Sequence, residues 1–196
     1  MTIDVTSAAA DASTVDRGIF PRALDGASLS LDQLVNVARQ GQAGLSIAES
    51  SKQAMDASVR VRNAMLHRGA PMYGITTGFG DSVGRQISAA KTAQLQRNLV
   101  TYHLNGVGPS AASDVVRATM LIRANCLVRG PSAIRPEVIN LLLGMLDAGI
   151  EPVVPERGSL GASGDLVPLC YVANSLLGDG EVRYRDRLWP ASAALP

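Results

Sequence analysis

The chain has 196 residues, of which 46% are hydrophobic and 18% charged, which predicts one globular domain with a sizeable core. Its net charge is +1 and no apolar run reaches the length of a membrane span, so neither nucleic acid nor a membrane is an expected partner. Cys126 and Cys170 lie in apolar helical patterns and are expected to be buried free thiols, and no metal site is predicted. No basic region followed by an apolar core marks a signal peptide, so the cytoplasm is the expected location.

Residues 1–27 are rich in Ala, Ser, Thr and Asp and show no clear hydrophobic periodicity. We therefore interpret them as a flexible leader. Over residues 28–196 the apolar residues recur mostly at helical spacing, which predicts a mainly α-helical domain with small irregular and hairpin segments.

Two capping boxes stand at the beginning of this domain, where a serine and a Gln or Glu three residues later each bond the other's backbone. Ser30 with Gln33 predicts a short helix to about residue 39, and Ser46 with Glu49 predicts a long helix to about His67. The apolar side chains expected to face inward from the first helix are Leu31, Leu34 and Val35.

The segment after the long helix contains three glycines within eight residues and cannot be the interior of a helix or a strand. We expect an irregular loop, and such loops carry function when a rigid scaffold positions them. The segment is Tyr73-Gly74-Ile75-Thr76-Thr77-Gly78-Phe79-Gly80.

Three further helices are predicted at about residues 88–104, 109–128 and 136–149. Ser88 caps the first of them, and Pro109 with Ser110 begins the second. The helix over 109–128 is apolar on most of its sides, so we expect it to be buried within a bundle.

Proline and turn residues organise the chain beyond these helices. Pro152 and Pro155 impose an extended path, because each fixes its own backbone and restricts the residue before it. Residues 182–184 and 187–189 flank the dipeptide Arg185-Asp186 and predict a small hairpin, with little strand elsewhere.

A glycine-rich loop over residues 158–165 leads into a helix that is predicted to extend to Leu177. A Ser-Gly-Asp sequence alone is more often a flexible loop with a helix cap. In Ala162-Ser163-Gly164, however, the Gly164 nitrogen can attack the Ala162 carbonyl, because glycine carries no side chain to obstruct it. Ring closure releases one water, and the Ser163 hydroxyl leaves with the α-hydrogen as a second. The product is a methylidene-imidazolone, an electrophile that would lie at a helix N-terminus.

Residues 73–80 and 158–169 together resemble the signature segments of the ammonia-lyases and 2,3-aminomutases that act on aromatic amino acids and histidine. The resemblance runs from about Ser28 to the C-terminus. It implies the N-terminal part of the fumarase/aspartase-like helical-bundle fold of that family, whose members are usually more than twice as long.

The resemblance also implies roles for individual residues. Ala162-Ser163-Gly164 would form the methylidene-imidazolone (MIO) prosthetic group autocatalytically, and Tyr73 would be the catalytic base. The reaction would eliminate ammonia from the α-carbon to give an arylacrylate, with re-addition at the β-carbon in a mutase. The residues expected to bind the aromatic amino acid substrate are His103, Leu104 and Gly80.

The pair His103-Leu104 is similar to the selector of the tyrosine-type branch, whereas plant phenylalanine enzymes carry Phe-Leu. A lone histidine in such a helix would otherwise be interpreted as structural. Leu169-Cys170-Tyr171 is closer to the aromatic branch than to the histidine branch, where Leu-Ala-His is usual. The resemblance thus favours a tyrosine lyase or mutase, with a histidine ammonia-lyase as the alternative.

Family members assemble as homotetramers, and their active sites use residues from later in the polypeptide. By itself the chain is therefore expected to be an incomplete, inactive fragment, or else a non-catalytic helical interaction module. Self-association is expected through the apolar faces of the helices that carry Leu121, Leu142 and Leu169.

Overall fold

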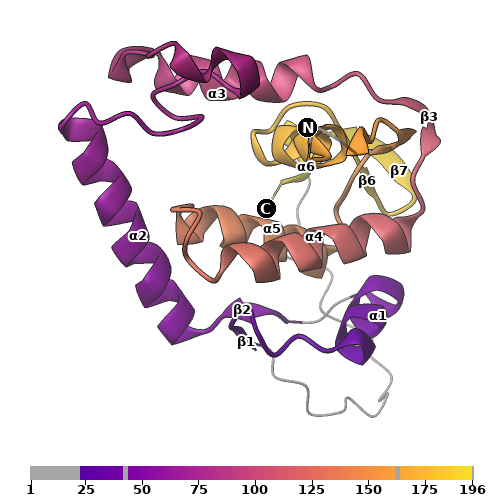
Figure 1. Ribbon diagram of the computed structural model, residues 1–196. Helices are drawn as coiled ribbons and strands as arrows, with labels where there is room; N and C mark the ends of the chain where they lie inside the picture. Colours follow the sequence, from indigo (N-terminus) through magenta and orange to yellow (C-terminus); the bar gives the residue numbers. More distant parts are fainter. Residues whose placement is uncertain (1–22, 42–43, 162–163, 196) are drawn as a thin grey trace.

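The computed structural model describes residues 23–41, 44–161 and 164–195, and this part of the chain is mainly helical, as predicted (Figure 1). Two helices form its centre, α4 (Ser113–Leu127) and α5 (Pro136–Ala148). Helix α5 starts on a proline at the first helical position and ends at Gly149 in the left-handed conformation, as the sequence predicts. Their inward side chains are among the most deeply buried of the described residues and include Met120, Leu121, Ile139, Met145 and Leu146.

Two further helices cover this centre. Helix α1 (Leu31–Gln40) packs on α4, and α6 (Leu166–Leu176) packs on α5 and on the short helix α7 (Ala191–Ala194). Both bonds of the predicted capping box are present at the start of α1. None of the described helices has the length and apolar character of a membrane span.

The remaining helices form an arm that extends from this body (Figure 1). Helix α2 (Glu49–His67) leads away from the body, and two short 3-10 helices, η1 (Gly80–Gly84) and η2 (Ala89–Lys91), lead into α3 (Thr92–Tyr102). Helix α3 returns to the body and packs against α6.

Short strands join the helices. The predicted hairpin is present as β6 (Glu181–Tyr184) and β7 (Arg187–Pro190), and β4 (Glu151–Pro152) extends it to three antiparallel strands. Arg185 and Asp186 both have positive φ, 49° and 58°, which gives the turn a twist that suits a two-residue hairpin.

More strand is present than the sequence predicts. Strand β3 (Val107–Ser110) pairs with β5 (Pro155–Arg157), and β1 (Ala23–Leu24) pairs in parallel with β2 (Ser46–Ile47). Residues 1–22 of the expected leader lie outside the described residues, and Leu24 is buried in the core.

Two of these pairings and one 3-10 helix correct the predicted starts of three helices. Ser46 belongs to β2, so Ala48 rather than a capping box begins α2. Pro109 and Ser110 belong to β3, and α4 begins at Ser113. Helix α3 begins at Thr92, because residues 89–91 form η2. Each correction has one cause: a partner strand or tighter turn takes backbone groups that local patterns assign to a helix.

The sequence also misassigned several buried faces. In α1, Leu31 is 72% exposed and Val35 is exposed, because Val37 and Ala38 face the core instead. In α4, Cys126 is an exposed free thiol, whereas Cys170 in α6 is buried as expected and its burial raises the pKa of the thiol.

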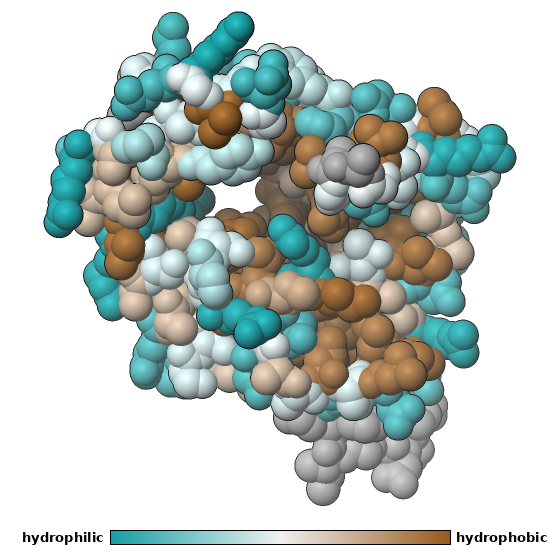
Figure 2. All heavy atoms as spheres, viewed as in Figure 1, coloured by the Kyte–Doolittle hydropathy of each residue, from teal (hydrophilic) through white to brown (hydrophobic). Residues whose placement is uncertain are grey.

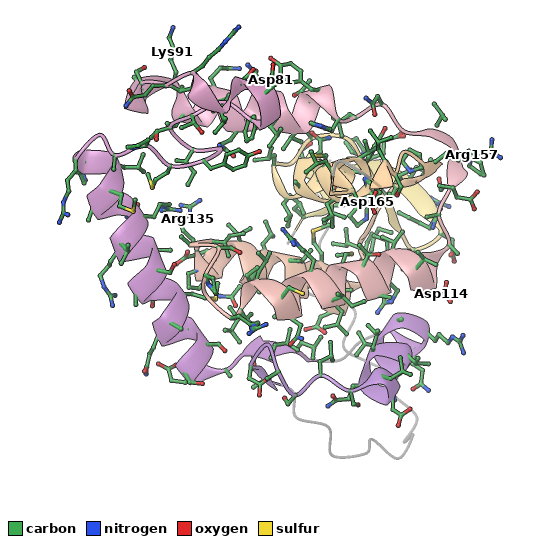
Figure 3. All side chains as sticks on the ribbon, viewed as in Figure 1. Asp81, Lys91, Asp114, Arg135, Arg157 and Asp165 are labelled. Atoms are coloured by element: carbon green, nitrogen blue, oxygen red, sulfur yellow. The ribbon has the colours of Figure 1, made fainter. Side chains whose placement is uncertain are left out.

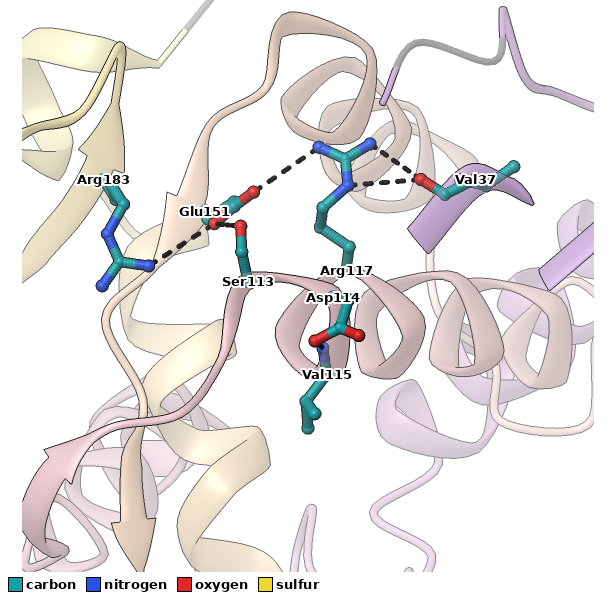
Figure 4. A network of polar contacts seen from close by, with 7 residues as sticks. All are labelled: Val37, Ser113, Asp114, Val115, Arg117, Glu151 and Arg183. Atoms are coloured by element: carbon teal, nitrogen blue, oxygen red, sulfur yellow. Dashed lines mark hydrogen bonds and ion pairs between the residues drawn. The ribbon is translucent and has the colours of Figure 1, made fainter. Parts of the chain in front are cut away.

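A buried ion pair and its hydrogen bonds connect several elements of the body to one another (Figure 4). The Arg117 guanidinium lies 3.6 Å from a Glu151 carboxylate oxygen, with the side chains only 6% and 9% exposed. Arg117 Nε and Nη2 also donate to the Val37 carbonyl, at 3.2 and 3.0 Å. Glu151 accepts from the Ser113 hydroxyl and pairs with Arg183 at 3.7 Å. The network thus joins α1, α4, β4 and β6.

We expect Glu151→Gln to lower the free energy of unfolding by about 3–5 kcal/mol, because it leaves the Arg117 charge buried without its carboxylate. Replacing both residues by Met and Leu should restore much of this loss. The matched control is Arg39→Met, which removes an exposed pair with Asp114 and should cost less than about 1 kcal/mol. Urea unfolding measures all three, and equal losses for Glu151→Gln and Arg39→Met would contradict the assignment.

Candidate active site

The segment from residue 70 to residue 80 makes an isolated β-bridge between Thr77 and Gln86, and two buried threonines, Thr76 and Thr77, organise the rest of it. The Thr76 hydroxyl accepts from the Met72 amide at 2.7 Å and donates to the Ala70 carbonyl at 2.9 Å. Hydroxyl side chains can take over backbone hydrogen bonds in this way where no regular ladder exists. The predicted irregular loop is therefore a specific, internally bonded structure.

Thr77 and Phe79 fix the backbone next to Tyr73. The Thr77 hydroxyl accepts from the Gly74 amide at 3.1 Å and donates to the Gly78 carbonyl at 3.0 Å. Gly74 has φ +70°, and a Cβ added there would lie 2.8 Å from the Phe79 ring. Only glycine meets both conditions without strain.

Tyr73 is held by its ring and by its hydroxyl. The ring meets Phe79 edge to face, with centroids 6.4 Å apart and planes at 89°. The phenol oxygen accepts from the Gly80 amide at 3.0 Å. The structure thus brings two of the predicted site residues together, while Tyr73 remains 65% exposed and accessible to a small molecule.

His103 ends α3, and its hydrogen bond decides the tautomer of the ring. Nδ1 lies 2.7 Å from the Leu99 carbonyl oxygen, which can only accept, so Nδ1 carries the hydrogen. In the neutral ring Nε2 is then an acceptor. His103 and the neighbouring Leu104 are both half-buried.

The segment after His103 is tied to α6. The Gly106 amide donates to the Tyr171 hydroxyl at 3.1 Å, and Tyr171 is a residue of α6. The N-terminus of α6 follows the glycine-rich loop. Helix α6 therefore contacts the residues after His103 and also begins directly after the predicted ring-forming loop.

Ala162 and Ser163 lie outside the described residues, but their neighbours are described. Gly164 has φ +82°, and a Cβ added to it would meet nothing within 4 Å. Asp165 follows at φ 60° and makes no side-chain cap on α6, so the positive end of the helix dipole faces the loop. Pro168 falls in the first turn of α6, as predicted. These residues fit the ring chemistry, which needs an unobstructed glycine and favours an electropositive setting.

The site residues are divided between the arm and the body. Figure 3 labels Asp81, next to Gly80, on the arm, and Asp165, next to Gly164, on the body. Figure 2 shows an open gap between the arm and the α4–α5 body, bordered partly by apolar surface. Tyr73 and His103 both belong to the arm, where α3 connects them.

Sequence reasoning did not find a groove between α4 and α6, of about 440 Å³. Its apolar lining includes Val115, Ile122 and Leu169, and Ser159 and Asp165 place it beside the glycine-rich loop. Sequence reasoning also did not find the hydrogen bonds made by Thr76 and Thr77, since no local pattern distinguishes a structural threonine in a loop from an exposed one.

A family model described as aromatic amino acid lyase matches residues 29–196. The chain belongs to this family. This confirms the predicted family and, with the helical fold, the predicted fold class.

Its relatives within the family act on different amino acids according to their names. The chain is 44% identical over 172 residues to a histidine ammonia-lyase of Streptococcus pyogenes serotype M49, covering 88% of the chain and 33% of the relative. A tyrosine aminomutase of Streptomyces globisporus matches with a TM-score of 0.82 and 36% identity, over 88% of this chain and 32% of that one. A histidine ammonia-lyase of Trypanosoma cruzi matches with a TM-score of 0.77 and 30% identity, over 87% of this chain and 32% of that one. The chain thus spans about a third of the length of these family members.

Gly74→Ala should destabilise the Tyr73 loop more than Gly69→Ala does. Both glycines have positive φ, +70° and +67°, but only at Gly74 would the new Cβ meet Phe79. We expect about 1–2 kcal/mol of local strain at Gly69 and about 1–3 kcal/mol more at Gly74. Hydrogen exchange of the amides of residues 72–80 measures both, and equal exchange in the two variants would argue against the Phe79 contact.

Proposed function

We propose that the chain is the part of an MIO-dependent ammonia-lyase or 2,3-aminomutase that supplies the ring-forming loop, the catalytic base and the substrate selector. The substrate class is aromatic amino acids, with tyrosine favoured. The observation that carries the preference for tyrosine over phenylalanine is the hydrogen bond from His103 Nδ1 to the Leu99 carbonyl, which leaves Nε2 as an acceptor.

The prosthetic group is assigned to Ala162-Ser163-Gly164. When present, MIO supplies an electrophile that converts the substrate amino group into a better leaving group. The support from this chain is the unobstructed Gly164 and the uncapped positive end of α6 beside it.

Tyr73 is assigned the removal of a proton from the substrate β-carbon. A general base must be held where it can reach that proton, and Tyr73 is fixed both by the Phe79 ring and by the Gly80 amide. In this role Gly80 orients the phenol oxygen, and its φ of +52° explains why glycine occupies the position.

His103 is assigned recognition of the far end of the substrate ring. An acceptor at Nε2 pairs with the phenol O–H of tyrosine, whereas phenylalanine has no donor to offer. A buried polar group left without its partner costs free energy, so such a site disfavours the analogue that lacks the hydroxyl.

Histidine is the second candidate substrate. The curated relative from S. pyogenes is a histidine ammonia-lyase at 44% identity, and an imidazole N–H could also donate to His103 Nε2. Tyr171, where histidine-type members usually carry histidine, supports tyrosine instead. Ammonia release from tyrosine, histidine and phenylalanine by the longest polypeptide that the gene encodes separates these candidates.

The active assembly is proposed to be a homotetramer. The 196-residue chain alone is expected to self-associate and to release no ammonia, the behaviour of a non-catalytic fragment. Leu121 and Leu142 themselves are buried within the chain, so other residues of these helices would form the associating surface. Helix α4 instead exposes Val115 (55%) and Ile122 (45%) along the groove beside α6.

Tyr73→Phe keeps the ring and its packing but removes the proton acceptor. In the longest encoded polypeptide we expect at least a ~10²-fold loss of turnover, while the variant keeps the loss of two waters that marks MIO formation. Intact mass is the accompanying measurement, because MIO lowers the mass of the polypeptide by two waters. Near-normal turnover in Tyr73→Phe would remove Tyr73 from the mechanism, and a parent polypeptide of unreduced mass would refute the assignment of MIO.

His103→Phe should change the preference between tyrosine and phenylalanine in favour of phenylalanine. The expected size is about 1–3 kcal/mol in differential transition-state binding, since the variant has no acceptor for the phenol. The ratio of kcat/KM values for the two substrates measures it. A conserved ratio would contradict the selector role of His103.

A further inference from the structure

Gln96 connects the Tyr73 loop to α3. Its side-chain amide donates to the Gly74 carbonyl, 22 residues earlier in the chain. Three features restrain Gly74: its amide donates to Thr77, the Phe79 ring occupies the space that a Cβ would need, and its carbonyl accepts from Gln96. Only the third contact comes from outside the loop.

The position of Gln96 on α3 relates it to His103. Seven residues separate the two, which is within 20° of two full helical turns, so both lie on nearly the same face. The rise between them is about 10 Å. One face of α3 therefore holds the Tyr73 loop near the middle of the helix and presents His103 at its C-terminal end.

We propose that Gln96 is a positioning residue that holds the Tyr73 phenol in register with His103. The inference rests on the function proposed above, in which Tyr73 removes the β-proton and His103 binds the far end of the same substrate. The two groups must then keep a fixed separation, and the bond from Gln96 to Gly74 sets it. A small displacement of a base from its proton lowers the rate steeply.

The chain supplies a matched control two residues away. Gln94 is also an exposed glutamine of α3, but its amide donates to Asn98 on the same helix, at 2.6 Å. Gln96→Met and Gln94→Met each remove one amide while preserving the length of the side chain. Because both side chains are largely exposed, neither change should affect global unfolding.

The first test uses the 196-residue chain and requires no activity. In Gln96→Met the hydrogen-bonded amides of Gly74, Thr76 and Gly78 should exchange about 3- to 10-fold faster than in the parent. In Gln94→Met they should exchange at the parental rate. Unchanged exchange in Gln96→Met, or equal acceleration in both variants, would overturn the inference.

The second test measures kinetics in the longest encoded polypeptide. Gln96→Met should lower kcat about 10-fold or more and leave KM for the amino acid within about twofold, whereas Gln94→Met should match the parent. A purely structural defect would lower the amount of folded enzyme and its melting temperature instead.

Comparison with Tyr73→Phe distinguishes a failure of the Gln96 proposal from a failure of the proposed function. If Tyr73→Phe loses turnover while Gln96→Met keeps its kcat, the positioning role of Gln96 is wrong and the proposed function stands. If the parent is inactive, or Tyr73→Phe remains fully active, the proposed function is wrong and the role of Gln96 is rejected with it.

Discussion

The body of this protein depends on a buried charge pair. Arg117 and Glu151 come from a helix and a strand 34 residues apart, and between them they bond α1 and β6 as well. Two charges removed from water are costly unless nearly every hydrogen bond is satisfied, so the elements that surround them have little freedom to move independently. Helix α4 and strand β4 are thereby fixed relative to each other, and α4 lines one side of the groove beside α6.

Local chemistry in the sequence predicted much of this architecture. The capping box of α1, the proline and glycine that bound α5, and the Arg185-Asp186 hairpin are all short-range signals, and all three are present. The misassigned starts of α2 and α4 share a different origin. There the outcome depends on a partner strand: Leu24 accepts a bond from the Ala48 amide, and Val154 accepts one from the Ala111 amide. Neither partner can be identified from the sequence nearby.

The candidate site was predictable in kind but not in detail. Its residues were proposed because two glycine-rich segments resemble those of a known family. The hydrogen bonds that organise the first of these segments come from Thr76, Thr77 and Gln96, and no local pattern in the sequence predicts their partners. Periodicity identifies which face of a helix is apolar, and it contains no information about a single polar contact between a helix and an irregular loop.

The division of labour between α3 and α6 bears on how such enzymes diverge. If the C-cap of α3 reads the substrate ring while the N-terminus of α6 carries the chemistry, substitutions at residue 103 can change the substrate without disturbing the reactive loop. The similar folds of a tyrosine aminomutase and a histidine ammonia-lyase are consistent with such independent inheritance. The Gly106–Tyr171 hydrogen bond is then the contact through which a shift at the end of α3 would first displace α6.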